Sequence, residues 1–142
     1  MVIVVRQVTK QEVDAVVEVW ERADQGGGAE RRLEVERALT ADPDLLLVAE
    51  VDGRLAGVIL GTCDGHRGYP KRIVVLPDCR QRGIGRALVR ELERRFVSRG
   101  IYRMNFTIRA ENNTSQAFSS TLGYAHEPGV MVWVKTLRPS QP

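Results

Sequence analysis

The sequence predicts a mixed α/β fold, in which a central mixed β-sheet is flanked by helices. Short runs rich in β-branched residues alternate with segments whose apolar residues recur every three or four positions. Two apolar runs meet at Asp52-Gly53, the dipeptide that tight hairpin turns prefer. Residues 101–109 alternate apolar and polar side chains, as a strand with one buried face does. We expect one domain over residues 1–138 and a frayed tail over 139–142.

The first half of the chain predicts one strand, two helices and a hairpin. Thr9 and Glu12 have the spacing of a capping box, so a helix should begin there. Three glycines at 26–28 should end it near Asp24, and Pro43 favours a turn before the hairpin. The expected elements are, in order, a strand, two helices and two strands, at residues 2–8, 9–24, 30–40, 45–51 and 54–62.

The second half predicts three strands and two helices. Residues 73–76 are apolar at every position, which is typical of a central strand covered on both faces. Gly100 is placed to end a long amphipathic helix. The expected elements are a strand, a helix, a strand, a helix and a strand, at residues 71–76, 83–99, 101–109, 113–122 and 130–137. The complete predicted order is β-α-α-β-β-β-α-β-α-β.

The stretch 74–86 carries the clearest functional signal. An apolar strand runs through a basic turn into the long helix, so several unpaired backbone amides should gather at the helix start. These amides and the helix dipole attract an anion such as phosphate. Glycines at 83 and 85 let the backbone approach the anion, and nearby arginines add positive charge.

The charge distribution is uneven, although the net charge is only +3. Residues 1–60 hold seven basic and twelve acidic residues, whereas residues 80–103 hold eight arginines and two glutamates. This basic segment fits nucleic acid or a polyanionic cofactor. No exposed aromatic residues are interleaved with the arginines, so we expect no nucleic acid. With no apolar run of about 18 residues and no signal peptide, we expect no membrane association and a cytoplasmic protein.

Cysteines and histidines are few. Cys63 and Cys79 should be free thiols in a reducing compartment, with Cys79 a neutral structural residue. The histidines, His66 and His126, have no paired spacing, so we expect no metal.

The motif Arg80-x-x-Gly83-x-Gly85, entered from Val-x-Pro, resembles the acyl-CoA pyrophosphate loop of the GNAT superfamily of N-acyltransferases. The segment from Asn112 that ends in Leu122-Gly123-Tyr124 resembles the closing segment of that superfamily, and the predicted order of elements matches its fold. Residues 64–68, Asp-Gly-His-Arg-Gly, are similar to a bacterial subgroup of YpeA-like acetyltransferases. The resemblance implies acetyl-CoA as cosubstrate and acetyl transfer to a primary amine of a small molecule or protein. The alternative is an acyl-CoA-binding sensor with weak or no catalysis.

The resemblance also implies the site residues. The pantetheine arm would pair with the backbone of 73–75 in the strand expected at 71–76, and one amide, of Val75 or Leu76, would polarise the thioester carbonyl. The pyrophosphate would lie on the amides of 81–86. The residues implied to bind the cofactor are Ile73, Val74, Val75, Leu76, Arg80, Gln81, Arg82, Gly83, Ile84, Gly85, Arg86, Asn112 and Ser119.

The acid and base are less clearly indicated. The position where the superfamily commonly has a tyrosine acid is Ser119, and the position of the glutamate base in N-terminal acetyltransferases is Thr107. Neither side chain titrates near neutral pH. His66 is the candidate base because imidazole does, while Asp64, Glu50 and Glu111 stay open as alternatives. The candidate catalytic residues are therefore His66, Ser119 and the backbone of Val75.

The partners expected are acetyl-CoA and an amine acceptor. The acceptor should be bounded by residues 24–30 and 64–68, where acidic residues near the first segment would suit a cationic amine. A homodimer stays an open alternative.

Overall fold

A computed structural model describes the backbone of residues 1–24 and 28–138, and the side chains of 1–23 and 30–138. The chain forms two compact units, Met1–Thr107 and Ile108–Pro142. The glycines at 26 and 27 and the tail at 139–142, for which the sequence predicts a helix end and fraying, lie outside the described residues.

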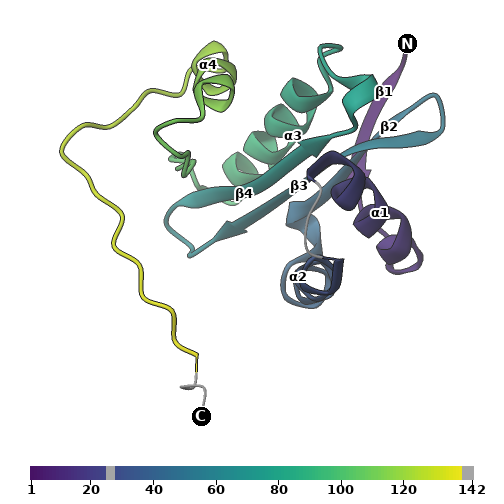
Figure 1. Cartoon of the computed structure of the whole chain (residues 1–142), viewed down its shortest axis with the longest axis horizontal. Helices are drawn as coiled ribbons and strands as arrows, with labels where there is room; N and C mark the ends of the chain where they lie inside the picture. Colours follow the sequence, from purple (N-terminus) through teal and green to yellow (C-terminus); the bar gives the residue numbers. More distant parts are fainter. Residues whose placement is uncertain (25–27, 139–142) are drawn as a thin grey trace. The chain divides into compact units, whose positions relative to one another are not determined.

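The first unit is built on a four-stranded antiparallel sheet with the order β1-β2-β3-β4 (Figure 1). The strands are β1 (Ile3–Gln7), β2 (Leu46–Val51), β3 (Arg54–Cys63) and β4 (Gly68–Val75). The hairpin predicted between β2 and β3 is confirmed, with positive φ angles of 51° at Asp52 and 81° at Gly53. Both central turn residues therefore adopt the left-handed conformation that a type I′ turn requires.

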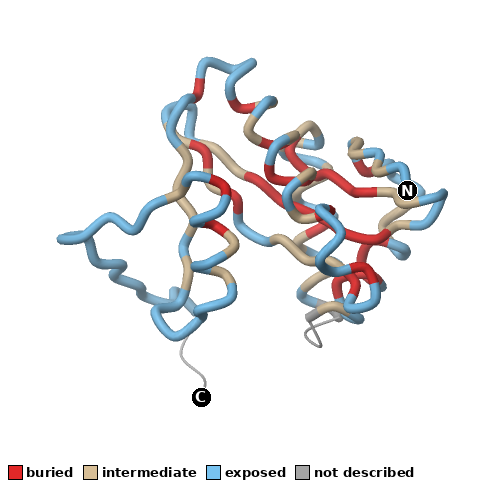
Figure 2. The backbone as a smooth tube through the Cα atoms, turned by 90° about the horizontal axis from the view of Figure 1, so that it is seen from above, coloured by how far each residue is buried: buried red, intermediate tan, exposed pale blue. Residues whose placement is uncertain are grey.

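Three helices cover this sheet, and all three were predicted. They are α1 (Val13–Asp24), α2 (Gly28–Ala41) and α3 (Ile84–Ser98). The Glu12 carboxylate accepts a hydrogen bond from the Thr9 amide at 2.9 Å, which stabilises the turn that leads into α1 as the capping box predicts. α1 and α2 lie on the opposite side of the sheet from α3 (Figure 1). The buried residues lie on the strands of the sheet and on the sides of the helices that pack against it (Figure 2).

Glycines let α3 lie close to the sheet. A Cβ atom built on Gly61 would come within 2.8 Å of the Leu92 side chain. One built on Gly68 would come within 2.7 Å of the Phe96 ring. Contacts this short are repulsive, so larger residues at these positions would push α3 away from the strands.

The predicted strand at 101–109 is not formed as a strand, and this expectation is corrected. Residues 101–107 make one parallel bridge, between Met104 and Gly68. Tyr102, predicted to face the core, is 79% exposed. β4 is likewise not the central strand that the apolar run at 73–76 suggested, because it ends the four-stranded sheet. A regular strand requires a partner along its whole length, and the single bridge supplies one at a single residue.

The second unit contains α4 (Asn113–Thr121), which was predicted. Asn112 is its N-cap, and the side-chain oxygen accepts a hydrogen bond from the Ser115 amide at 3.0 Å. Gly123 follows the helix with a φ of 92°. The strand predicted at 130–137 is not formed, and the backbone of this stretch is coloured as exposed throughout (Figure 2). An apolar sequence alone does not make a strand without a neighbour to pair its backbone.

Candidate functional site

The turn from β4 into α3 presents a row of backbone amides. Gln81 and Gly83 have positive φ angles of 62° and 82°, so the backbone reverses twice before the helix begins. The first amide that donates within the helix is that of Ala87, to the Gly83 carbonyl at 3.0 Å. The amides of 81–86 donate to no acceptor in the described chain, and the Gly83 N-cap has no side-chain cap. This geometry suits a bound diphosphate.

The arginines around this turn divide into two kinds. Arg82 and Arg86 are exposed and form no ion pair with any described residue. Arg80 instead donates from Nε to the Val75 carbonyl at 3.1 Å and from Nη2 to the Ala23 carbonyl at 3.2 Å. The guanidinium of Arg80 therefore joins the end of β4 to the last turn of α1. Arg82 and Arg86 are the side chains available to an anion.

The outer edge of β4 is available for pairing at alternate residues. The Leu76 amide donates to the Ala56 carbonyl at 2.8 Å, on the β3 side. This bond rules out the Leu76 amide as the predicted thioester donor. Because antiparallel partners alternate between bonded and non-bonded pairs, the amides of Val75 and Ile73 point to the opposite edge. Of the two predicted donors, only Val75 has an amide without a partner among the residues that the structure describes.

A cleft opens beside β4 just after its bridge to residue 104. The Gly68 amide donates to the Arg103 carbonyl at 2.9 Å, and the Asn105 amide donates to the Gly68 carbonyl at 2.9 Å. The next donor of a parallel ladder would be the amide of residue 70, which is proline and has none. Pro70 therefore ends the ladder after a single bridge. A register shift follows, because Pro70 and Arg72 face consecutive residues of β3 and Lys71 is the extra, bulged residue.

The cleft contains a pocket of about 350 Å³. Its walls come from β3, from β4 and from the segment that follows α3. The lining residues are Thr62, Tyr69, Pro70, Lys71, Asn105 and Thr107. Three hydroxyl groups, one carboxamide and one ammonium group can therefore contact a molecule there. Thr107, the position of a glutamate base in N-terminal acetyltransferases, lines this pocket as a neutral side chain.

His66 lies in the loop between β3 and β4, and its side chain is exposed and does not line the pocket. The carboxylate of Asp64 holds this loop together. It accepts from the amides of His66 at 2.8 Å and Arg67 at 2.7 Å, and from the Tyr69 hydroxyl at 3.2 Å. The bonds from the amides of Arg67 and His66 lower the pKa of Asp64. A carboxylate so stabilised is a weak base, so the role of Asp64 is to position the loop and Tyr69.

The other candidate residues lie elsewhere. Glu50 on β2 is paired with Arg6, which also binds Glu12, so it is a member of an ion-pair cluster. Ser119 is buried on α4, and Glu111 is exposed shortly before that helix. Both belong to the second unit, as does Asn112, whose side-chain oxygen is used in capping.

Sequence reasoning missed most of the pocket. Tyr69, Lys71 and Asn105 were not singled out, because no family motif includes them and each is an ordinary strand residue in isolation. One signal was present. A proline within a run that otherwise reads as a strand indicates that pairing stops on one side, and Pro70 is that residue.

Comparison with known proteins shows the family of this chain. The model of the acetyltransferase (GNAT) family matches residues 13–124. An acetyltransferase of Sodalis glossinidius is 36% identical over 134 residues, covering 94% of each chain. An acetyltransferase of Pectobacterium atrosepticum is 36% identical over 121 residues, covering 84% of this chain and 86% of its own.

Solved structures share the fold. The aminoglycoside N-acetyltransferase AAC(6')-Iy, in complex with CoA, has a TM-score of 0.80 at 23% identity, covering 94% of this chain and 95% of its own. The PaiA N-acetyltransferase of Thermoplasma acidophilum, in complex with coenzyme A, has a TM-score of 0.76 at 20% identity, covering 89% and 92%. No helix in the described part of this chain is long and apolar enough to cross a membrane. With four-fifths of its length matched by the family model and full-length relatives above 30% identity, the chain belongs to the acetyltransferase (GNAT) family.

Proposed function

We propose that this protein is an acetyl-CoA-dependent N-acetyltransferase that transfers the acetyl group directly to a primary amine. The observation that carries the proposal is the row of unpartnered amides at residues 81–86, which continues from a strand edge that is also open. A diphosphate fits the first feature and an extended amide-containing arm fits the second. Both features belong to one continuous stretch, as a single molecule of coenzyme A would require.

The residues of the chain then have distinct roles. The amides of 81–86 bind the pyrophosphate, and Arg82 and Arg86 add positive charge at the same place. The pantetheine arm lies along the end of β4, between the pyrophosphate site and the Val75 amide. The Val75 amide donates to the thioester oxygen as negative charge develops there, a kind of contact worth about 3 kcal/mol where it has been removed in other enzymes. Acetyl-CoA, when bound, supplies a thioester with a good leaving group.

The acceptor amine must lose a proton before or during attack on the thioester. We assign this step to His66, the one imidazole on the loop beside the pocket, with the proton passing through water because the side chain does not line the pocket. Residue 119, where the superfamily commonly has a tyrosine acid, is a serine in this chain. A thiolate leaves readily, so a serine in place of a tyrosine slows turnover without preventing it.

Calorimetric titration with acetyl-CoA, followed by thiol-release assays over a panel of amines and peptides, tests the proposal. We expect one binding site per chain and release that depends on the amine. Absence of acetyl-CoA binding by the folded protein would overturn the proposal. Tight binding without release on any acceptor would support the sensor alternative, which the neutral residues at 107 and 119 favour.

A further inference from the structure

The pocket beside β4 has an unusual charge for the site of an amine acceptor. Its six lining residues include one formal charge, the ammonium group of Lys71, and no carboxylate. An amine acceptor is itself protonated in neutral water, so a positive wall repels it. Lys71 is exposed, so its charge is available at the pocket mouth, and an acceptor that also carries an anionic group would be attracted to it.

Lys71 is free to bind such a group. As the bulged residue of β4 it lacks a partner in the β3 register. Its ammonium group forms no ion pair or hydrogen bond with any described residue. The neighbouring cation differs, because Arg72 donates from Nε to the Glu34 carboxylate at 3.1 Å. The nearest carboxylate of the loop, Asp64, accepts from two backbone amides and from Tyr69.

The phosphates of coenzyme A do not explain Lys71. The proposed diphosphate site begins after the end of β4, at residues 81–86, whereas Lys71 is four residues before Val75. At about 3.3 Å per residue, that places Lys71 about 13 Å upstream along the strand. Lys71 is also on the pocket side of the Val75 amide, where the acceptor would lie.

We infer that the acceptor is a primary amine that also carries an anionic group, a carboxylate or a phosphate, which binds Lys71. The neutral groups of Thr62, Tyr69 and Asn105 contact the rest of the molecule. This inference rests on the proposed function and narrows its substrate class. It also replaces the purely cationic acceptor that the acidic residues near position 24 suggested.

The test compares matched acceptors that differ only in the anion. Amino acids are assayed against their amides, and phosphoethanolamine against ethanolamine, by thiol release with saturating acetyl-CoA. We expect kcat/KM to be at least tenfold higher for the anionic member of the preferred pair. The pair with the larger ratio distinguishes a carboxylate from a phosphate. An equal or smaller kcat/KM for the anionic members overturns the inference.

Variants of Lys71 then separate its role from general charge effects. We expect Lys71→Met to lower kcat/KM at least tenfold for the member that carries the anion and to raise it for the member without one, because the charge that repels its ammonium group is removed. Lys71→Glu should reverse the preference. Lys10→Met, which removes the same charge from the turn before α1, should preserve it. An equal loss on both members in Lys71→Met overturns the inference, because a general structural role would produce it.

Failure of this inference can be distinguished from failure of the proposed function. If the proposed function is wrong, the wild-type protein binds no acetyl-CoA. The variants of Lys71 should bind acetyl-CoA as the wild type does, since the residue lies outside the proposed cofactor site. Protein that binds acetyl-CoA but releases no thiol with any member of either pair overturns the inference and leaves cofactor binding standing.

Discussion

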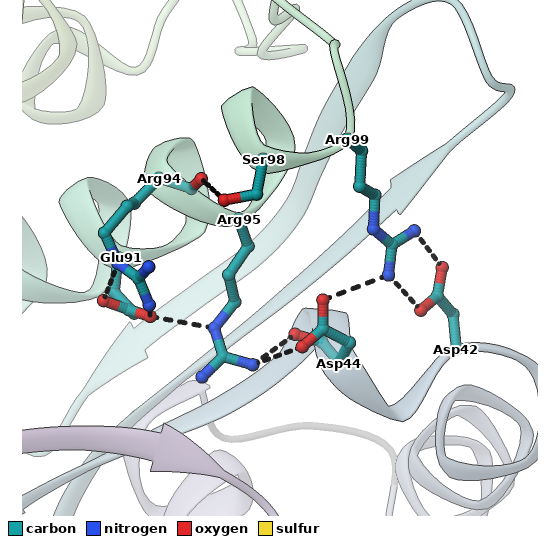
Figure 3. A network of polar contacts seen from close by, with 7 residues as sticks. All are labelled: Asp42, Asp44, Glu91, Arg94, Arg95, Ser98 and Arg99. Atoms are coloured by element: carbon teal, nitrogen blue, oxygen red, sulfur yellow. Dashed lines mark hydrogen bonds and ion pairs between the residues drawn. The ribbon is translucent and has the colours of Figure 1, made fainter.

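Both ends of α3 carry arginines, but they differ in whether a carboxylate pairs with them. At its beginning, Arg82 and Arg86 are exposed and form no ion pair with a described residue. At its end, Arg94, Arg95 and Arg99 each bind a carboxylate (Figure 3). A sequence count of eight arginines over residues 80–103 treats them alike. The structure shows that the presence of an acidic partner decides which arginines remain available to a ligand.

A network of ion pairs holds the C-terminal end of α3. Arg95 donates to the Asp44 carboxylate at 2.6 Å and to the Glu91 carboxylate at 2.9 Å. Arg99 donates to Asp42 at 2.6 Å and to Asp44 at 3.2 Å (Figure 3). The aspartates lie at η2 (Pro43–Leu45), just before β2, so the network ties the helix to a turn 51 to 57 residues away in sequence. The end of α3 is therefore tied to the turn before β2, whereas its beginning is where we propose that the diphosphate binds.

The largest effect should come from a carboxylate placed at the beginning of the helix. Gly83→Glu puts a negative charge where the diphosphate would lie, and we expect the Kd for acetyl-CoA to rise at least 100-fold, about 2.7 kcal/mol. Calorimetric titration measures it.

Gly100→Glu is the matched control at the other end. Gly83 and Gly100 have φ angles of 82° and 78°, and neither has an atom within 4 Å of an added Cβ. Both substitutions therefore impose the same backbone strain. Equal loss of binding in the two variants would contradict the assignment of the diphosphate to Gly83.

The next effect should come from the unpaired arginines. The double variant Arg82→Met/Arg86→Met removes two charges near the proposed diphosphate, and we expect the Kd for acetyl-CoA to rise about tenfold, or about 1.4 kcal/mol. The loss should shrink as salt increases, because screening already weakens these contacts. Titrations at two salt concentrations check both statements. Arg90→Met/Arg94→Met removes two paired arginines, and a similar loss there would show that net charge alone matters.

The stabilising role of the far end predicts an effect on unfolding. The Arg95 side chain is 16% exposed and holds two carboxylates, so Arg95→Met should lower the free energy of unfolding by about 1.5 kcal/mol. Arg94 binds the same Glu91 but is 66% exposed, so Arg94→Met should lower the free energy of unfolding much less than Arg95→Met does. Urea unfolding compares the two. Equal losses would mean that burial of the guanidinium does not set its contribution.

The sequence predicts the helices of this chain better than its strand partners. Capping at Thr9 and Asn112 and the glycine at position 100 are local signals, so helix positions follow from neighbouring residues. The strands expected at 101–109 and 130–137 are sequences with strand character whose pairing depends on distant backbone. No local pattern supplies that information.

The candidate site divides in the same way. The amide row at 81–86 was predictable, because a strand, a glycine turn and a helix are consecutive in the chain. The pocket was not, because Thr62, Lys71 and Asn105 come from three separate segments. The choice between the amides of Val75 and Leu76 also required the structure, since it depends on which of them faces Ala56 across the ladder.

The smallest predicted effect is a change in the free energy of unfolding at acidic pH. The hydrogen bond from Arg99 lowers the pKa of Asp42 in the folded protein, so the unfolded chain binds the proton more readily. This contribution to stability is therefore present above about pH 4, the ordinary aspartate value, and is lost as the pH falls further. Asp42 is 35% exposed, so solvent screening keeps the contribution below about 1 kcal/mol.

Urea unfolding between pH 7 and pH 3 measures this difference. Wild type and Arg99→Met should differ most at pH 7, and their curves should converge toward pH 3. The pair formed by Arg6 and Glu12, where the hydrogen bond from Arg6 lowers the glutamate pKa to about 2, is common to both proteins and cancels in the comparison. The free energy of unfolding of Arg82→Met should instead follow the same pH dependence as that of the wild type, because no carboxylate in the described chain pairs with Arg82. Convergence in both variants would mean that the two ends of α3 do not differ in the way their ion pairs indicate.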